Sequence, residues 1–436
     1  MKLARLFFQP IDNAQLILFR IIYGSLITIE AWGAIATGWV RRTLIEPQFT
    51  FHFIDFPFLQ PLGGNGMIYY FFLMGLFGLM VTLGFRYRLA IVSYSIMWAG
   101  VYFMQKTSYN NHYYLMLLFN FIFCFLPANR YHSIDVKMKP NLQRLACSVW
   151  CVWIFKVMIL VVYFYSAVAK MYPAWLNAVP IKIWFSQKTD YWLIGPLLTK
   201  EWFQYTVAWG GIVFDLLIGP ALLWRKTRKV AFLISIFFHL FNSFVFQVGV
   251  FPYLGISFAL FFYRPQQIRR WFFPSKPEYI SLKEQINHSN KLIPIGVTLF
   301  LIVQLLLPLR HHYFTGNVNW TEEGHRLSWR MMLRSKVGHI TLSVVNNETK
   351  HKEQINLNHY LTGKQIRKVA VRPDMMWQFI QYLKKNYANK GNVDISIYAQ
   401  SQVSLNGAPY RALYDPSFDL AKAEWKRWRT STWVLK

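Results

Sequence analysis

The chain has 436 residues, of which 54% are hydrophobic, 19% are aromatic and only 15% are charged. Soluble domains usually carry about 25% charged residues, so the composition excludes an ordinary soluble protein and indicates an integral membrane protein. The formal net charge is +28, but the basic residues lie mainly in short loops between apolar runs and no nucleic-acid-binding motif is present, which excludes nucleic acid as a partner.

The predicted elements begin with an apolar segment over residues 14–34. The residues before it form no cleavable signal peptide, because their apolar stretch is short and ends at Pro10. Each apolar segment is predicted to be a helix, since about 20 apolar residues cross the ~30 Å hydrocarbon core. The predicted spans are 14–34, 66–84, 89–105, 113–127, 146–169, 203–224, 230–248, 250–263 and 292–309. The predicted fold class is therefore mainly α, a polytopic transmembrane helical bundle of about nine spans.

Lys and Arg residues divide the loops between these spans into two sets. Because cytoplasmic loops carry an excess of basic residues, the richer set predicts a cytoplasmic N-terminus. These loops contain Arg86, Arg88, Arg130, Lys137, Lys139, Arg144, Arg225, Lys226, Arg228, Lys229, Arg264, Arg269, Arg270 and Lys276. An odd number of spans then places the C-terminal residues in the periplasm or lumen, and an even number would reverse that placement.

The C-terminal residues change in character. Residues 340–346 and 393–405 alternate between apolar and polar side chains, as strands do, and residues 375–387 have a helical period. We therefore predict two domains: residues 1–309 form the transmembrane helical domain, and residues 310–436 form an extracytoplasmic mixed α+β domain.

Several ionisable residues lie inside predicted spans, where they are costly and indicate function. Lys170 ends the fifth span between apolar and aromatic neighbours. Desolvation disfavours its ammonium form, and a neutral lysine is a usable general base; the alternative is a lysine that snorkels to the membrane interface. Arg20 and Glu30 are predicted to neutralise other buried charges, and Asp215 to pair with one of the cations.

Two histidines have similar alternatives. His112 follows Asn110 and Asn111 at the start of the fourth span, and it is either a site residue or an interfacial histidine beside a helix cap made by Ser108 or Asn110. His239 and Asn242 share a helical face and are either site residues or a hydrogen-bonded structural pair. The topology places His112 and Lys170 at similar depth near the outer face, so one cavity could contain both of them with His239.

The three cysteines, Cys124, Cys147 and Cys151, lie in or beside predicted spans. We interpret them as small buried hydrophobic residues. No disulfide and no metal site is predicted.

Eight segments together resemble one family. They are FRIIYGSLITIE (19–30), GFRYR (84–88), KTSYNNHYYL (106–115), VYFYSAVAKMYPAW (162–175), FFHLFNSFVFQVGVFPY (237–253), QLLLPLRHHY (304–313), NWTEEGHRLSWRMML (319–333) and YDPSFDLAKAEWKRWRTSTWV (414–434). In this order they resemble the vitamin K-dependent γ-glutamyl carboxylases, whose membrane part is related to the horizontally transferred transmembrane (HTTM) domain.

The resemblance implies a reaction. A lysine deprotonates a vitamin K hydroquinone, oxidation by O2 yields vitamin K epoxide and a strong base, and a peptide glutamate loses a γ-proton and gains CO2 to become γ-carboxyglutamate. By position, the resemblance implies that the catalytic residues are Lys170, His112 and Asn111, the cofactor-binding residues are His239, Asn242 and Asn110, and the substrate-binding residues are His325 and Trp329. The implied partners are a glutamate-containing peptide, membrane lipid and the quinone, with no metal.

The sequence also departs from the family. Gly324 and His325 replace a Leu-Tyr pair that animal members associate with the glutamate substrate, and the animal disulfide has no matching cysteines. The shorter chain resembles a bacterial member, for which the cofactor could be a menaquinol. Two other functions stay open: a quinol epoxidase without carboxylation, and a non-enzymatic quinone- or lipid-binding membrane protein or transporter.

Overall fold

The computed structural model describes residues 6–280, 292–389, 391 and 394–436. Each predicted span coincides largely with helical structure. These helices are α2 (Ala14–Ala36), α3 (Gly66–Leu83), α4 (Tyr87–Met104), α5 (Asn111–Phe123), α7 (Trp150–Lys170), α11 (Glu201–Leu223), α12 (Arg228–Phe246), α13 (Phe251–Phe258) continued by the 3₁₀ helix η4 (Ala259–Phe262), and α15 (Leu292–Leu306) continued by the 3₁₀ helix η5 (Leu307–Tyr313).

Within the described residues, six helices are long and apolar enough to cross a membrane: α2, α3, α7, α11, α12 and the continuous helix Leu292–Tyr313. Helices α4, α5 and α13 are not among them. A membrane protein with several apolar helices is thus confirmed, whereas the count of nine spans stays a prediction.

Shorter elements connect these helices. Strands β1 (Pro10–Asp12) and β2 (Ala146–Ser148) pair antiparallel, with Ile11 opposite Cys147. The remaining connecting elements are η1 (Arg41–Ile45), η2 (Lys106–Ser108), α6 (Ile134–Met138), η3 (Pro140–Leu142), α8 (Pro173–Leu176), α9 (Val179–Ser186), α10 (Gly195–Leu198) and α14 (Pro265–Phe272).

Gly84 ends α3 and shows why this turn requires glycine. Its φ of 63° is left-handed, a conformation that glycine adopts without steric cost. A Cβ at this position would lie 2.5 Å from the Cβ of Ser133 and 2.8 Å from Nη1 of Arg20. The backbone turn therefore sits directly against the guanidinium group of α2.

The C-terminal residues form the predicted mixed α+β structure. Three antiparallel strands lie in the order β4-β3-β5, and Lys336 at one end of β3 is opposite Leu405 while Asn346 at its other end is opposite Ile395. The elements are α16 (Val318–Thr321), β3 (Lys336–Asn346), β4 (Lys352–Gln354), η6 (Leu357–His359), α17 (Gly363–Val369), α18 (Pro373–Asn389), β5 (Ile395–Leu405) and η7 (Leu420–Lys422). Helix α18 packs apolar side chains such as Phe379 and Leu383 against the sheet.

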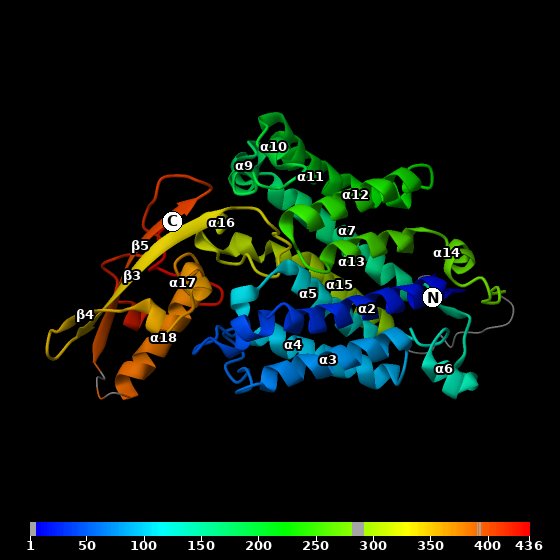
Figure 1. The fold of residues 1–436 in the computed structure, drawn as a ribbon, viewed down its shortest axis with the longest axis horizontal. Coiled ribbons are helices and arrows are strands. Elements are labelled where there is room, and N and C mark those ends of the chain that lie inside the picture. The colour runs from blue at the N-terminus through cyan, green and yellow to red at the C-terminus, as the bar shows by residue number, and fades with distance from the viewer. Residues whose placement is uncertain (1–5, 281–291, 390, 392–393) are drawn as a thin grey trace.

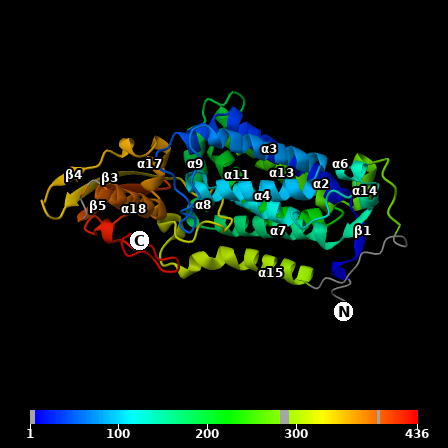
Figure 2. The same cartoon turned by 90° about the horizontal axis from the view of Figure 1, so that it is seen from below.

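Figure 1 shows the apolar helices as one elongated bundle, with β3, β4 and β5 beyond one end and the N-terminus near the other. Figure 2 shows α15 alongside the bundle, with the sheet again at one end. The core of the C-terminal part also contains Phe51, which comes from the loop between α2 and α3. The predicted domain boundary between residues 309 and 310 stays a prediction. The core of the C-terminal part includes a residue from the N-terminal side of this boundary.

The prediction that Arg20 and Glu30 neutralise other buried charges holds only for Arg20, which interacts with the buried carboxylate of Asp135 without forming an ion pair. Arg20 donates to the carbonyl oxygens of Ala128 at 3.0 Å and His132 at 2.5 Å, and Glu30 accepts from the hydroxyl of Tyr113 at 2.7 Å. Neither forms an ion pair within the described ranges. Backbone and phenol groups satisfy these side chains, so Arg20 holds the loop after α5 against α2.

The three cysteines are free. Cys147 and Cys151 are buried as predicted, whereas Cys124 is only partly buried. Cys147 lies in β2 and not in the predicted helix, because α7 begins only at Trp150.

Candidate active site

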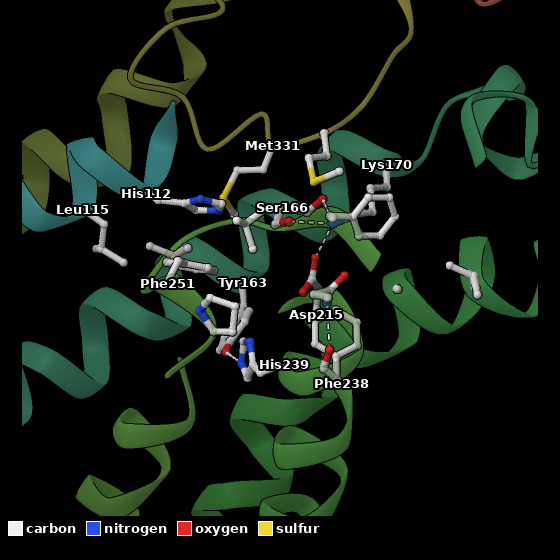
Figure 3. Close-up of a pocket in the computed structure, with 18 of the residues that line it drawn as sticks. His112, Leu115, Tyr163, Ser166, Lys170, Asp215, Phe238, His239, Phe251 and Met331 are labelled. Carbon is white, nitrogen blue, oxygen red and sulfur yellow. Dashed lines mark hydrogen bonds and ion pairs between the residues drawn. The ribbon is translucent and has the colours of Figure 1, made fainter. Parts of the chain in front are cut away.

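An apolar pocket of about 970 Å³ lies among α5, α7, α9, α11, α12 and α13. Most of its walls are aliphatic and aromatic side chains, and its polar residues include His112, Lys170, Asp215, His239 and Asn242. Figure 3 shows Met331, from the segment before β3, above the space between His112 and Lys170. The pocket therefore contains His112, Lys170 and His239 together, as the topology predicted; their chemical roles stay predictions.

Lys170 is the last residue of α7 and is only 9% exposed. Its ammonium group forms an ion pair with Asp215 of α11 and donates to the hydroxyl of Ser166 at 2.6 Å (Figure 3). Its Nζ also lies 5.7 Å from the ring centre of Trp175. The snorkelling interpretation does not fit a side chain held inside the pocket, and the predicted pairing of Asp215 with a cation is confirmed.

Three polar side chains line one face of α7, because Tyr163, Ser166 and Lys170 are separated by three and four residues. Tyr163 was not among the predicted site residues, although this spacing was available to find it. Its hydroxyl lies 3.0 Å from Nε2 of His239 (Figure 3). Helix α7 thereby contacts both Asp215 of α11 and His239 of α12.

His239 is 2% exposed and lies against α13. A Cβ on Gly255 would lie only 2.4 Å from Cε1 of the His239 ring, so the ring needs a glycine on the facing helix. Asn242 donates to the carbonyl oxygen of Phe238 at 3.0 Å, within its own helix. His239 and Asn242 line the same pocket but do not form the predicted alternative, a hydrogen-bonded pair.

The asparagines at the start of α5 are structural as well as close to the pocket. The side chain of Asn110 accepts from the backbone N–H of Tyr113 at 2.7 Å and caps α5. Asn111 accepts from the hydroxyl of Tyr109 at 2.8 Å. The His112 ring stacks on Phe251, with ring centres 3.7 Å apart, and no hydrogen bond holds it among the residues that the structure describes. Asn110 is thus the helix cap, and the imidazole nitrogens of His112 are available to a ligand.

A second cavity of about 1030 Å³, here called the basic chamber, adjoins the apolar pocket. Asn110, Asn111, His112 and His325 line it. Five cationic residues and one carboxylate also line it: Arg330, Arg334, Lys336, Lys368, Arg372 and Glu322. His112, Trp184, Met331 and Met332 line both cavities. His112 is thus the predicted catalytic residue that faces both spaces.

Glu322 neutralises only part of this positive charge. Its carboxylate pairs with Arg334 and lies 3.4 Å from Nδ1 of His325 and 3.9 Å from Nζ of Lys336. Burial would raise the pKa of the Glu322 carboxyl, but Arg334 together with the neighbouring basic residues outweighs burial, and the pKa lies well below its usual range. Burial lowers the pKa of Lys336 to about 7. Excess positive charge therefore remains mainly on the guanidinium groups of the chamber.

The two predicted substrate-binding residues are placed differently. His325 lines the basic chamber, and its Nδ1 lies 3.1 Å from the carbonyl oxygen of Glu322. Burial lowers the pKa of His325 well below its usual value, so the ring is neutral at pH 7. Trp329 is completely buried against Tyr114, with ring centres 5.0 Å apart. Trp329 lines neither cavity and supports the wall behind them.

Comparison with known families covers nearly the whole chain. Residues 8–266 match the family model of the HTTM domain, and residues 289–436 match that of the vitamin K-dependent gamma-carboxylase lumenal domain. The chain belongs to the vitamin K-dependent γ-carboxylase family. Membership in this carboxylase family indicates an enzyme of the membrane with a lumenal domain, glutamate-containing substrates and a vitamin K cofactor. No solved structure matches the chain significantly.

Proposed function

We propose that this carboxylase-family member converts peptide glutamate to γ-carboxyglutamate, and that oxidation of a vitamin K-type hydroquinone to its epoxide by O2 drives the addition of CO2. One observation carries the proposal: the buried Lys170–Asp215 pair lies in an apolar pocket that meets a basic chamber at His112. The apolar pocket suits a quinol, and the basic chamber suits an anionic peptide.

The residues of the apolar pocket fit a quinol head group. Ligand pockets are usually mostly apolar with a few polar groups. The rings of Phe238 and Phe251 line this pocket and offer apolar surface. Lys170, His112 and His239 would contact the polar edge of the quinol, for which a menaquinol is also suitable. When bound, the quinol supplies through its oxidation the strong base that a lysine cannot provide for a glutamate γ-carbon.

Lys170 acts in this proposal as the base that accepts a hydroxyl proton. The amine must first be neutral, and Asp215 is the group that can take its proton, because the two side chains are in direct contact. Transfer of the proton from Lys170 to Asp215 leaves both side chains uncharged. Because charges are costly in an apolar site, this transfer makes the neutral amine easier to form. Ser166 then orients the amine through its hydroxyl at 2.6 Å.

The basic chamber receives the peptide. Arg330, Lys368 and Arg372 give it an excess of positive charge that attracts carboxylates, and His112 at the junction brings the glutamate side chain next to the apolar pocket. The aromatic and methionine side chains around His112 exclude water from the reacting groups. We further propose that Asn111, Asn242 and Asn110 support this junction, that the N-terminus is cytoplasmic and that the chamber faces the periplasm or lumen.

The proposal is tested in membranes that contain the full chain. Reduced vitamin K, O2, labelled bicarbonate and a glutamate peptide should together give labelled peptide and epoxide in equal amounts. Formation of epoxide without labelled peptide, with every peptide tried, would show a quinol epoxidase. The replacement of the family's Leu-Tyr pair by Gly324 and His325 is the feature that keeps this alternative open. A chain that gives neither product while it binds quinone would be a binding protein or transporter.

Substitution of Lys170 by alanine separates a catalytic lysine from a structural one. We expect Lys170→Ala to abolish epoxidation and carboxylation together, and a small added amine to restore part of the epoxidation. Lys200→Ala is the control, because Lys200 is exposed at the start of α11. Full activity in the Lys170→Ala variant would contradict the assignment of this lysine as the base.

A further inference from the structure

A third cavity lies at the opposite end of the helical bundle from the sheet, between the turn that joins α11 to α12 and helix α14 (Figure 1). It encloses about 1040 Å³ and is here called the inner cleft. Its lining includes five cationic residues, Arg225, Arg228, Lys229, Arg264 and Arg270, and one carboxylate, Glu278. Neither the proposed reaction nor the family match assigns a role to this cleft.

The positive charge of the inner cleft is largely uncompensated. Glu278 lies 3.7 Å from Arg269, which is outside the lining. Arg225, Lys229, Arg264 and Arg270 take part in no ion pair with another residue of the described ranges. Arg228 differs, since its guanidinium donates to the carbonyl oxygens of Leu222 and Leu223 at the end of α11.

Lys156 adds an independent observation. It lies inside α7 in a predicted span, where an ionisable residue normally has a named partner. Its Nζ lies 4.8 Å from the ring centre of Trp153 and 5.8 Å from that of Phe262, and it is close enough to Arg228 for the two like charges to interact. No carboxylate pairs with Lys156 in the described part of the chain. Lys156 is half-buried beside Arg228, so an anion bound in the cleft would supply the partner that the described residues do not.

The surroundings of the cleft identify the type of anion. Trp224 is 61% exposed and Trp271 is 54% exposed, and tryptophan is enriched at membrane interfaces. Along α12, Leu233 and Phe237 are 65% and 73% exposed. An anion bound in the cleft therefore lies beside a surface suited to acyl chains. Basic pockets on the cytoplasmic side of membrane helices bind the head groups of anionic lipids.

We propose that the inner cleft and Lys156 bind the phosphate head group of an anionic phospholipid, whose acyl chains lie along the exposed face of α12. Arg225, Lys229, Arg264 and Arg270 donate to the phosphate oxygens, and Lys156 approaches from the hydrocarbon side. The site is separate from the apolar pocket and does not depend on the proposed reaction.

The test measures thermal unfolding of the purified full chain in detergent during titration with phosphatidylglycerol, phosphatidylcholine or inorganic phosphate. Phosphatidylglycerol should raise the unfolding temperature saturably, and the other two should not. Arg225→Gln with Arg270→Gln should weaken the apparent affinity for phosphatidylglycerol roughly tenfold or more, because each basic side chain at an anionic lipid surface contributes substantially. Lys156→Met should also weaken it while every cation that lines the cleft is kept.

Lys137→Gln with Lys139→Gln is the matched control, because it removes two exposed lysines of the same predicted membrane side outside the cleft. The control should bind phosphatidylglycerol like the original chain. Equal losses in both double variants would show general charge attraction and overturn the site. An equal effect of phosphatidylcholine, or a saturable effect of inorganic phosphate alone, would overturn the lipid assignment.

Discussion

Lys170 and Asp215 face each other from neighbouring helices in a pocket with mainly apolar walls. Removing one partner of a buried ion pair leaves an unpaired charge in low dielectric, which is far more costly than losing an exposed pair. The two residues therefore act as a unit, and each should affect the chemistry of the other.

At the scale of this residue pair, we expect Asp215→Asn to reduce epoxidation and carboxylation together by roughly 10²–10⁴-fold, the usual contribution of general acid–base catalysis. The amide cannot accept the lysine proton, so the proposed transfer within the pair is lost. Initial rates with saturating quinol provide the measurement. Glu201→Gln is the control on the same helix, because its pair with Lys182 is exposed; an Asp215→Asn variant as active as this control would refute the proton transfer.

Asn110 allows a test of capping against cofactor binding. Because its side chain caps α5, Asn110→Ala should cost about 1 kcal/mol of stability, whereas Asn110→Ser should keep the cap. Thermal unfolding and the KM for quinol give separate readings. If Asn110 also binds the quinol, Asn110→Ser should raise the KM while the unfolding temperature is retained. An unchanged KM in the serine variant would remove Asn110 from the cofactor site.

The sequence identified much of the pocket at residue scale and little of the chamber. Lys170, His112 and His239 were recognisable as polar residues in apolar spans, and the alternation of spans placed them at one end. The cations of the chamber come from the loop before β3, from the first residue of β3, and from α17 and the turn after it. These segments meet only through tertiary packing. Only the fold shows that Trp329 is buried behind the wall, and its substrate-binding role stays a prediction.

At the scale of elements, the contact between α12 and α13 depends on Gly255. Gly255→Ala would place a methyl group against the His239 ring, so the ring must move and lose its contact with Tyr163. We expect a cost of roughly 1–3 kcal/mol, as for other overpacked cores, together with weaker quinol binding. Unfolding temperature and quinol KM are the measurements.

The control for Gly255 is Gly296→Ala in α15, where a Cβ meets nothing within 4 Å. Alanine is the better helix former there, so this variant should be neutral or more stable by up to about 1 kcal/mol. Equal effects of the two substitutions would contradict a specific contact between α12 and α13.

Long apolar runs predicted the helices well because length and apolar character alone require a helix in lipid. The same argument could not find α8, α9, α10 or α14, which are too short to carry a span signal. In the C-terminal part, alternation predicted β3 and β5, whereas β4 has only three exposed residues and no such pattern. Local pattern therefore predicted the long elements, and tertiary contacts decided the short ones.

At the scale of the whole molecule, Asp374 ties the helical bundle to the C-terminal part. Its carboxylate lies 2.5 Å from Nζ of Lys106, in the turn before α5, and 2.5 Å from Nη1 of Arg326. Burial would raise the pKa of Asp374, but Arg326 and Lys106 outweigh it and hold the pKa below its usual range. The stabilisation from this carboxylate is therefore complete at neutral pH and declines only as the solution becomes strongly acidic, below about pH 4.

Asp374→Asn should cost roughly 3–5 kcal/mol, because Lys106 and Arg326 then keep buried, unpaired charges. Asp55→Asn is the matched control: Asp55 pairs with Arg427 across the same two parts of the chain, but both side chains are largely exposed. Thermal unfolding at pH 7 should separate the two variants clearly. Similar unfolding temperatures would mean that the buried pair does not hold the parts together.

The shared wall between the apolar pocket and the basic chamber has a kinetic consequence. His112 and Met331 border both spaces, so a lipid-soluble and a water-soluble ligand can be resident at the same time without competing for one entrance. In the proposed reaction, the two half-reactions then occur within one ternary complex. A glutamate side chain held at His112 would then lie next to the quinol whose oxidation drives carboxylation, with neither bulk water nor lipid between the two.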